Sequence, residues 1–146
     1  MIQIRAMRPD DLPAVRPLMV ELGYDLEAAE VERSFRAVAA ASGQALLVGE
    51  WQGRVVALLH VYARPALDKP PEAVVQALVV SADGRRSGIG KAMMEAAEAW
   101  ARANGYGSVA LASQIQRADA HAFYKALGYD IVATSHLLRK ELTDVG

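Results

Sequence analysis

The stretch from Val74 to Met94 most constrains what this chain can fold into. It begins as an apolar, β-branched run, passes through a polar turn at Asp83-Gly84, and enters an Ala-rich helical pattern through Arg-Arg-Ser-Gly-Ile-Gly. A strand, a glycine-bearing turn and a helix N-terminus in this order form an anion cradle. The reason is that the unpaired N–H groups and the dipole of the first helical turn favour negative charge. The sequence therefore predicts a site for a phosphate-bearing ligand.

Two common phosphate-binding motifs do not fit this stretch. A P-loop requires Ser or Thr after its lysine to bind magnesium, and here Ala92 follows Lys91. A dinucleotide fingerprint requires Gly-x-Gly-x-x-Gly directly after the strand, and the spacing of Gly84, Gly88 and Gly90 differs. A protein that uses the same cradle for ATP stays open as a weaker alternative, against which the missing hydroxyl argues.

Composition restricts the class of protein. A chain of 146 residues with 53% hydrophobic residues is expected to form one domain, residues 1–146, around a sizeable core. The net charge of −1 and the interspersed charges predict no nucleic-acid or membrane partner. The absence of cysteine excludes disulfides, thiolate metal sites and a cysteine acyl-enzyme. Charges near the start interrupt any signal peptide, so a soluble cytoplasmic protein is expected.

The hydrophobic patterns predict a mixed α/β order of elements. Ten segments follow one another as β-α-α-β-β-β-α-β-α-β: residues 2–6, 12–22, 26–41, 45–51, 55–62, 74–80, 89–104, 108–113, 118–127 and a final strand or strand pair over 129–142. The strands at 74–80 and 108–113, with the helix between them, form a right-handed parallel βαβ unit. Ligands of such sheets bind beyond the carboxyl ends of parallel strands, which is where the Arg85–Gly90 turn is expected.

Two motifs in this order resemble those of the GNAT N-acetyltransferase superfamily. Arg85-Arg86-Ser87-Gly88-Ile89-Gly90 after Leu78-Val79-Val80 resembles its acetyl-CoA signature, Arg/Gln-x-x-Gly-x-Gly/Ala. The second motif is the C-terminal pattern carried by Ala120, Phe123, Tyr124, Gly128 and Tyr129. The resemblance implies an α/β (α+β) fold, with a single mixed, mostly antiparallel sheet and a central parallel βαβ unit flanked by helices.

The resemblance also implies a reaction and a donor site. Acetyl would pass from acetyl-CoA to a primary amine, with no metal. Leu78 N–H would face the thioester carbonyl, and Tyr124 would protonate the leaving thiolate. The implied acetyl-CoA contacts are Leu78, Val79, Val80, Arg85, Arg86, Ser87, Gly88, Ile89, Gly90, Lys91, Arg117, Ala120 and Tyr124. Arg117 stands where the family usually has Asn, so its contact with CoA is weighed against a solvated cation at a helix start.

The general base and the acceptor are less constrained. Many relatives carry an acid on the central strand, whereas Gln76 and Ala77 do not titrate. Glu72, His60 and Glu50 stay open as bases that act through a water. Tyr24, Tyr62 and Gln76 are candidate substrate contacts, and the expected acceptor is a small molecule or an amino-acid derivative. The alternative function is a degenerate acyl-CoA sensor without turnover, and a homodimer stays open.

Overall fold

The computed structural model describes residues 2–85, 87–113 and 118–143. The chain divides into two compact units, residues 1–112 and 113–146. Among the described residues, the first unit contains five strands, two 3₁₀ turns and three helices, and the second contains a fourth helix. A single domain over residues 1–146 stays a prediction.

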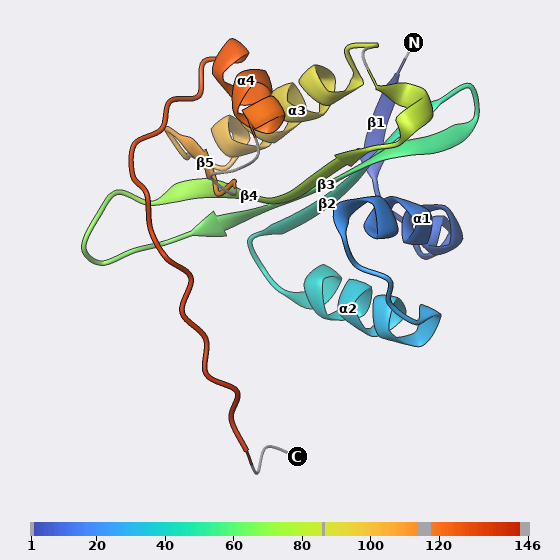
Figure 1. The fold of residues 1–146 in the computed structure, drawn as a ribbon, viewed down its shortest axis with the longest axis horizontal. Helices are drawn as coiled ribbons and strands as arrows, with labels where there is room; N and C mark the ends of the chain where they lie inside the picture. The colour runs from blue at the N-terminus through green and yellow to red at the C-terminus, as the bar shows by residue number, and fades with distance from the viewer. Residues whose placement is uncertain (1, 86, 114–117, 144–146) are drawn as a thin grey trace. The chain divides into compact units, whose positions relative to one another are not determined.

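The first unit is built on one five-stranded sheet in the order β1-β2-β3-β4-β5 (Figure 1). The strands are β1 (Gln3–Ala6), β2 (Gln44–Trp51), β3 (Arg54–Arg64), β4 (Glu72–Val80) and β5 (Val109–Leu111). The first three pairs of neighbours are antiparallel, and β4 and β5 are parallel. The predicted mixed sheet with a βαβ unit is confirmed, and the parallel pair lies at one end of it.

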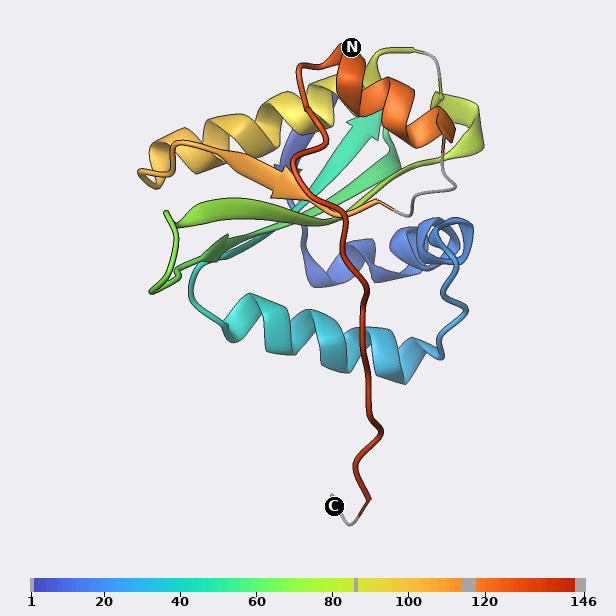
Figure 2. The same cartoon turned by 60° about the vertical axis from the view of Figure 1, so that its left-hand side comes forward.

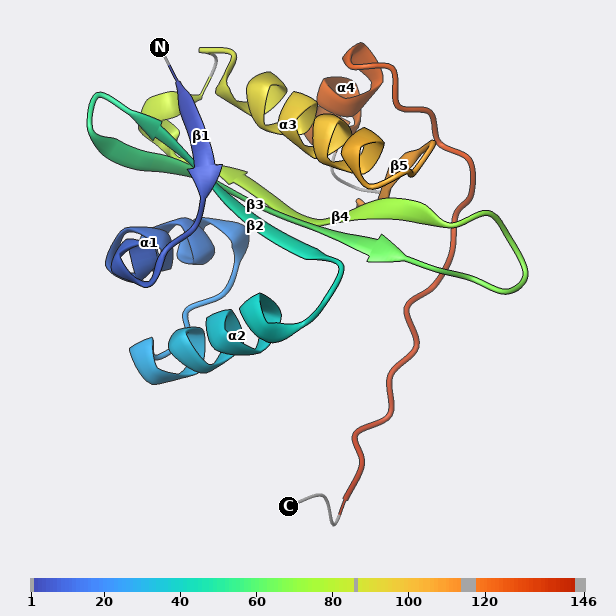
Figure 3. The same cartoon turned by 180° about the vertical axis from the view of Figure 1, so that it is seen from behind.

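Helices cover both faces of this sheet. The 3₁₀ turn η1 (Pro9–Asp11), α1 (Leu12–Leu22) and α2 (Ala28–Ala40) lie on one side, and α3 (Ile89–Ala103) lies on the other (Figures 1 and 3). On the α1 side, Val15 and Leu18 pack in one buried cluster with Val48, Leu58 and Val79. The α3 side contributes its own buried residues, Ile89, Met93, Met94, Ala97 and Ala101. The helices predicted at 12–22 and 89–104 are confirmed to within one residue.

A buried ion pair fixes the entry to α1. Both Asp11 oxygens accept bonds from the Arg5 guanidinium at 2.8 Å, and Oδ2 also accepts the Arg8 backbone N–H at 2.7 Å. The Asp11 residue is only 5% exposed. The bond from Arg5, with help from Arg8, holds the pKa of Asp11 below its ordinary value. Asp11 therefore ties β1 to the start of the first helix.

The second unit differs from the sequence prediction. Its helix, α4 (Ala118–Ala126), has the predicted position. The final strand or strand pair predicted over 129–142 is wrong, because residues 129–143 run as extended chain with no strand pairing (Figure 2). A strand is defined by its neighbour as well as by its own residues, since its N–H and C=O groups need partners. The apolar residues of this segment predict an extended backbone but not the partner.

Candidate functional site

The edge of β4 next to β5 is open over its second half. β5 pairs with β4 only through Ala73, Val74 and Val75. Beyond Val75, no described residue continues the parallel ladder, so the two strands part. The backbone groups on that side of β4 from residue 76 to residue 80 therefore have no strand neighbour. A sheet edge of this kind can pair with an extended ligand.

A β-bulge lies where the opening begins. His60 is opposite Ala77 and Val61 is opposite Val75, so Gln76 is an extra residue on β4 with no counterpart on β3. Such a residue shifts the alternation of the strand by one position. Gln76 is the polar residue within the apolar run 74–80, and this was the signal of the bulge in the sequence. From the sequence, Gln76 was considered as a substrate contact and not as a bulge.

The bulge decides which backbone groups face the opening. Ala73 N–H donates to the Ser108 carbonyl at 3.1 Å, so alternate residues of β4 face β5 up to the bulge. After the bulge, Ser81 N–H donates to the Val56 carbonyl at 2.8 Å on the opposite side. In an antiparallel ladder, this bond turns the N–H and C=O of Val80 away from β3. Leu78, two residues earlier, faces the same way.

The turn after β4 leads into the N-terminus of α3. The 3₁₀ turn η2 (Ala82–Gly84) precedes it, and Gly88 is the N-cap residue of α3 with φ +82°. This left-handed backbone favours glycine, and a Cβ there would meet nothing within 4 Å. Ile89, Gly90 and Lys91 follow in the first helical turn, where backbone N–H groups have no intrahelical acceptor. The predicted cradle therefore has an accessible surface.

Side chains around the turn hold its shape. Arg85 Nε donates to the Val80 carbonyl at 3.2 Å, which agrees with an outward-facing Val80. The Glu21 carboxylate at the end of α1 accepts the Ala82 N–H at 3.2 Å and lies 3.5 Å from the Arg85 guanidinium. The Ser87 hydroxyl donates to the Gly84 carbonyl. Sequence reasoning missed Glu21, because nothing in its local pattern sets it apart from other exposed helical acids.

The other predicted donor-site residues of this unit differ in how far their side chains are exposed to solvent. Leu78 is half-buried, whereas the side chains of Val79 and Ile89 are buried, at 7% and 3% residue exposure. The Val79 side chain packs in the buried cluster on the α1 side, so only the backbone of Val79 is available to contact acetyl-CoA. Lys91 is exposed at the helix start, where its ammonium is available to an anion. Arg86 lies outside the described residues.

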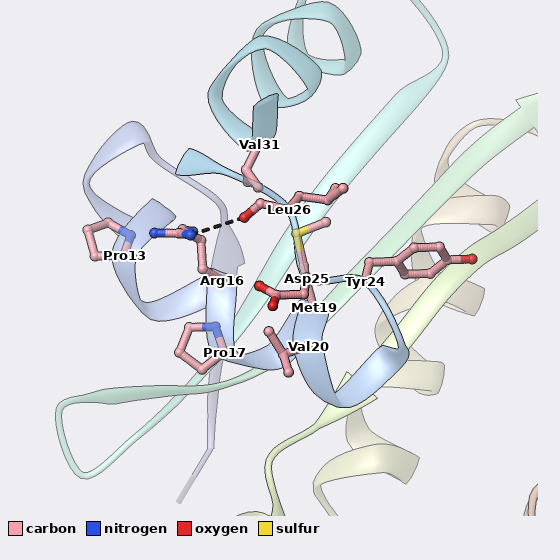
Figure 4. Close-up of a pocket in the computed structure, with 9 residues that line it drawn as sticks. All are labelled: Pro13, Arg16, Pro17, Met19, Val20, Tyr24, Asp25, Leu26 and Val31. Carbon is pink, nitrogen blue, oxygen red and sulfur yellow. Dashed lines mark hydrogen bonds between the residues drawn. The ribbon is translucent and has the colours of Figure 1, made fainter. Parts of the chain in front are cut away.

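A pocket lies against the loop that follows α1. Its volume is about 410 Å³, and its lining comes from α1, the loop and the start of α2 (Figure 4). The lining residues are Pro13, Arg16, Pro17, Met19, Val20, Tyr24, Asp25, Leu26 and Val31. Arg16 donates to the Leu26 carbonyl at 3.0 Å and so fixes the loop. Glu21, next to the last residue of α1, contacts the turn after β4, and the loop begins two residues after Glu21 in the chain. Tyr24 follows Glu21 by three residues in the chain and is exposed.

Two of the three candidate bases are engaged elsewhere. Glu72 Oε1 lies 2.8 Å from the Arg64 guanidinium, and its Oε2 accepts the Ser108 hydroxyl at 3.0 Å. Glu50 Oε1 lies 3.2 Å from the Arg5 guanidinium. Both carboxylates thus act as structural acceptors at other points of the sheet.

His60 is the candidate base whose position fits. It lies opposite Ala77, beside the bulge, and its Nε2–H donates to Gln44 Oε1 at 2.7 Å. That bond leaves Nδ1 as the acceptor of the neutral ring. Burial lowers the pKa of His60 below its ordinary value of 6.5, because desolvation disfavours the imidazolium. The Tyr62 ring lies 6.0 Å from the imidazole, centre to centre.

The second unit contains the other predicted donor-site residues. In α4, Ala120 and Tyr124 are both partly buried. The Tyr124 ring packs edge-on against Phe123 at 5.0 Å and Tyr129 at 6.0 Å. The Tyr124 carbonyl accepts the Tyr129 N–H at 3.0 Å, so the helix end and the aromatic group form one local structure. Arg117 lies outside the described residues.

Two further findings bear on the class of site. Within residues 2–85, 87–113 and 118–143, no group of three or more His, Asp or Glu side chains is placed to hold a metal ion. None of the helices in these ranges is both long and apolar enough to cross a membrane.

Comparison with known proteins gives consistent matches. Residues 12–129 match the sequence model of the Acetyltransferase (GNAT) family. The uncharacterized N-acetyltransferase YhdJ of Bacillus subtilis (strain 168) is 32% identical over 125 residues, which cover 85% of this chain and 87% of that protein. Among solved structures, AAC(6')-Iy in complex with the bisubstrate analogue CoA-S-monomethyl-acetylneamine has a TM-score of 0.87 at 18% identity, covering 97% and 99% of the two chains. A transcriptional regulator from Bacillus halodurans C-125 has a TM-score of 0.86 at 21% identity, covering 96% and 100%.

Proposed function

The chain belongs to the GNAT acetyltransferase family, and from this premise we propose that it transfers acetyl from acetyl-CoA to the primary amine of a small molecule. The observation that carries the proposal is the open edge of β4 beside the N-terminus of α3. An extended amide chain that ends in a pyrophosphate can pair its amides with the open strand edge and place its pyrophosphate at the helix N-terminus that follows the strand.

The open edge supports a specific placement of the donor. The pantetheine amides pair with the outward backbone groups of Val80, and the Leu78 N–H donates to the thioester carbonyl. Because Arg85 Nε holds the Val80 carbonyl in the free protein, the ligand competes with that bond or uses the Val80 N–H alone. The N–H groups of residues 89–91 and the Lys91 ammonium receive the pyrophosphate. Ser87 acts through the turn that it closes.

The reaction in this placement is direct attack. The neutral amine nitrogen bonds to the thioester carbon, and the carbonyl oxygen gains negative charge that the Leu78 N–H stabilises. The C–S bond then breaks, and the CoA thiolate leaves with a proton. The amine loses one proton in forming the amide. We propose Tyr124 as the donor to the thiolate, on the family resemblance alone.

His60 is our proposed general base, which acts on the amine through water. Its neutral ring has an acceptor nitrogen, and by register it lies opposite Ala77, one residue along β4 from Leu78. A base with a lowered pKa is ready to accept a proton at neutral pH. Glu50 and Glu72 fit this role less well, because their carboxylates bind Arg5 and Arg64.

The acceptor amine binds, in this proposal, at the pocket beside the α1–α2 loop. Its lining is mainly apolar, with the Asp25 carboxylate as the anionic group that can bind an ammonium. The Tyr24 ring is directed away from the side where Pro13 and Arg16 lie (Figure 4), so it can form a wall toward the donor. A volume of about 410 Å³ suits a small molecule or an amino-acid derivative. Tyr62 and Gln76 are further proposed contacts.

One observation favours a second function. Neither Gln76 nor Ala77 on β4 titrates, so a protein that binds acyl-CoA as a sensor without turnover is the alternative. In that case His60 would be a satisfied half-buried histidine rather than a base. The donor cradle would be the same in both cases.

An acetylation assay over a panel of small primary amines, with free CoA as the readout, separates these functions. The proposal predicts amine-dependent release of CoA well above the rate without amine. Calorimetry with acetyl-CoA on the same sample supplies the control. Binding without amine-dependent release would assign the sensor function, and the absence of binding would refute both.

A further inference from the structure

Arg16 is a half-buried cation that no carboxylate neutralises. Among the described residues, three arginines are half-buried, namely Arg5, Arg16 and Arg64. The guanidiniums of Arg5 and Arg64 each pair with a carboxylate at 2.8 Å. Arg16 instead donates to the Leu26 carbonyl at 3.0 Å, and no Asp or Glu in the described ranges forms an ion pair with it. A carbonyl accepts a hydrogen bond but leaves the positive charge uncompensated, and a charge that is partly removed from water favours an opposite charge beside it.

The missing carboxylate is what distinguishes Arg16 from the other two. Nε of all three arginines is buried and has no acceptor among the described residues, so that property alone indicates no ligand. The terminal N–H groups of Arg5 and Arg64 bind carboxylates. In Arg16 one terminal nitrogen binds Leu26, and the guanidinium keeps further N–H donors for a ligand. A planar guanidinium of this kind favours a carboxylate or a phosphate.

The position of Arg16 on α1 directs its side chain to the pocket beside the α1–α2 loop. Val15 and Leu18, on the other face of the helix, pack in the buried cluster against the sheet. Arg16 lines the pocket, and its bond to Leu26 joins the guanidinium to the loop (Figure 4). A long side chain loses rotamer freedom when it binds a ligand, and this bond removes part of that freedom in advance. The guanidinium is therefore held at the pocket in the free protein.

A charged group of opposite sign lines the same pocket. Asp25 is exposed, and no Lys or Arg of the described residues forms an ion pair with it. Arg16 and Asp25 therefore line one cavity of about 410 Å³ without being paired with each other. Most of the other lining residues are apolar. Separated opposite charges in a mainly apolar pocket are complementary to a small molecule that carries both an ammonium and a carboxylate.

We propose that Arg16 forms a carboxylate subsite, and that the acetyl acceptor is an amino acid, with both a primary amine and a carboxylate. This inference rests on the proposed function and names the class of its acceptor. The Arg16 guanidinium binds the carboxylate, the Asp25 carboxylate binds the ammonium, and the apolar lining contacts the carbon chain. A phosphate monoester fits less well, because it carries roughly two negative charges and Asp25 lines the same pocket.

The charges of substrate and product follow from this assignment. The ammonium loses a proton, its nitrogen bonds to the acetyl carbon, and the C–S bond breaks. One further amine proton is lost in forming the amide, and CoA leaves as the thiol. The acetylated product keeps its carboxylate and loses its positive charge. Asp25 therefore binds the substrate and not the product, which favours product release.

Acetylation kinetics with matched acceptors test the carboxylate subsite. Leucine, β-alanine and γ-aminobutyrate are each compared with the corresponding carboxamide, which keeps the amine and the shape but has no negative charge. With the fraction of neutral amine taken into account, kcat/KM for the best acid should exceed that for its amide by about 10- to 100-fold, because hydrogen bonds between charged groups discriminate to this extent. Equal values for every pair, or faster turnover of phosphoethanolamine than of the acids, would overturn the inference and leave acetyl transfer standing.

Substitutions at Arg16 assign the preference to this side chain. Arg16→Gln should bring the ratio of acid to amide close to one, whereas Arg16→Lys keeps the positive charge and should still prefer the acid. Arg33→Gln is the matched control, since Arg33 is an exposed arginine of α2 outside the pocket lining, and it should keep the wild-type ratio. A purely structural Arg16 would affect acid and amide alike, so a wild-type ratio in Arg16→Gln would overturn the inference.

A binding measurement separates this inference from the proposed function. Because Arg16 Nε is buried, its N–H resonance should be protected from exchange and visible in ¹H–¹⁵N NMR spectra, and its loss in Arg16→Lys assigns it. Without acetyl-CoA, at least one of the three acids should shift this resonance saturably, and its carboxamide should not. No shift with any acid would overturn the subsite even if amines are acetylated. A shift without acetylation of any amine would support the subsite and refute the proposed function alone.

Discussion

A valine at position 88 should abolish CoA binding while the protein stays folded, and the structure supplies a matched control. Gly88 precedes α3 with φ +82°, and Gly105 follows it with φ +83°. A Cβ at either position would meet nothing within 4 Å. The two glycines thus have similar backbone conformations and similar free space, and they flank the same helix. They differ in that Gly88 lies at its N-terminal end and Gly105 at its C-terminal end. Only the N-terminal end belongs to the proposed cradle.

The expected cost to folding is the same for both substitutions. Placing a residue with a Cβ in left-handed backbone costs about 1–2 kcal/mol, and the loss of unfolded-state freedom returns about 0.4–1 kcal/mol. Each variant should therefore lose about 1 kcal/mol in free energy of unfolding. Such a loss is small against the 5–15 kcal/mol that typically stabilises a domain, so both variants should fold.

Urea unfolding and calorimetry with CoA together test this reasoning. Both variants should unfold at closely similar urea concentrations. Gly105→Val should bind CoA as the wild type does, whereas Gly88→Val should bind at least about a hundredfold more weakly, which corresponds to about 2.7 kcal/mol. Equal CoA affinity in the two variants would refute the cradle and leave Gly88 as a helix start.

Three further predictions concern single side chains. His60→Gln should lower kcat by roughly 10²–10⁴. In the wild type, kcat/KM should rise with pH through the lowered pKa of His60, below 6.5, and the variant should lack this rise; an unchanged pH profile would remove His60 as the base. Asp11→Asn should lower the free energy of unfolding by about 2–3 kcal/mol in urea at pH 7. Because the pKa of Asp11 is lowered from 3.8, its stabilisation is present above that pH and is lost as the pH falls through the lower folded value, so an equal loss in the variant at pH 3 and pH 7 would contradict the ion pair. Tyr124→Phe should reduce kcat by roughly 10²–10⁴ with the Kd of acetyl-CoA changed less than about tenfold, and a kcat within about threefold of wild type would leave Tyr124 as packing.

Local patterns were enough to predict most of the elements. The 3.6-residue period of Val15 and Leu18, and of Met93 and Ala97, reports burial on one helix face, and the structure buries these residues. The strands β2, β3 and β4 follow from apolar runs, and the Gln52-Gly53 turn separates the first two. These predictions succeeded because each depends on residues that are near one another in the sequence.

The parts that sequence reasoning missed depend on distant partners. The role of Glu21 depends on Ala82, some sixty positions further along the chain. The bulge at Gln76 depends on the register between β4 and β3, and the sequence of residues 74–80 alone does not specify that register. Residues 129–142 were predicted as a strand or strand pair because their composition favours extended backbone, and composition does not specify the neighbour that a strand requires. Where a contact sets the structure, both partners are needed to predict it.

The central claim is that the bulge turns the backbone of Leu78 and Val80 toward an open edge where acetyl-CoA binds. Amide hydrogen exchange, measured by NMR residue by residue with and without acetyl-CoA, tests this claim directly. In the free protein, Leu78 and Val80 amides should exchange faster than those of Ala77 and Val79, which face β3. Acetyl-CoA should slow exchange at Leu78 and Val80 and leave the other two nearly unchanged. Protection of Leu78 and Val80 in the free protein, or no change at either on saturation with acetyl-CoA, would contradict the account.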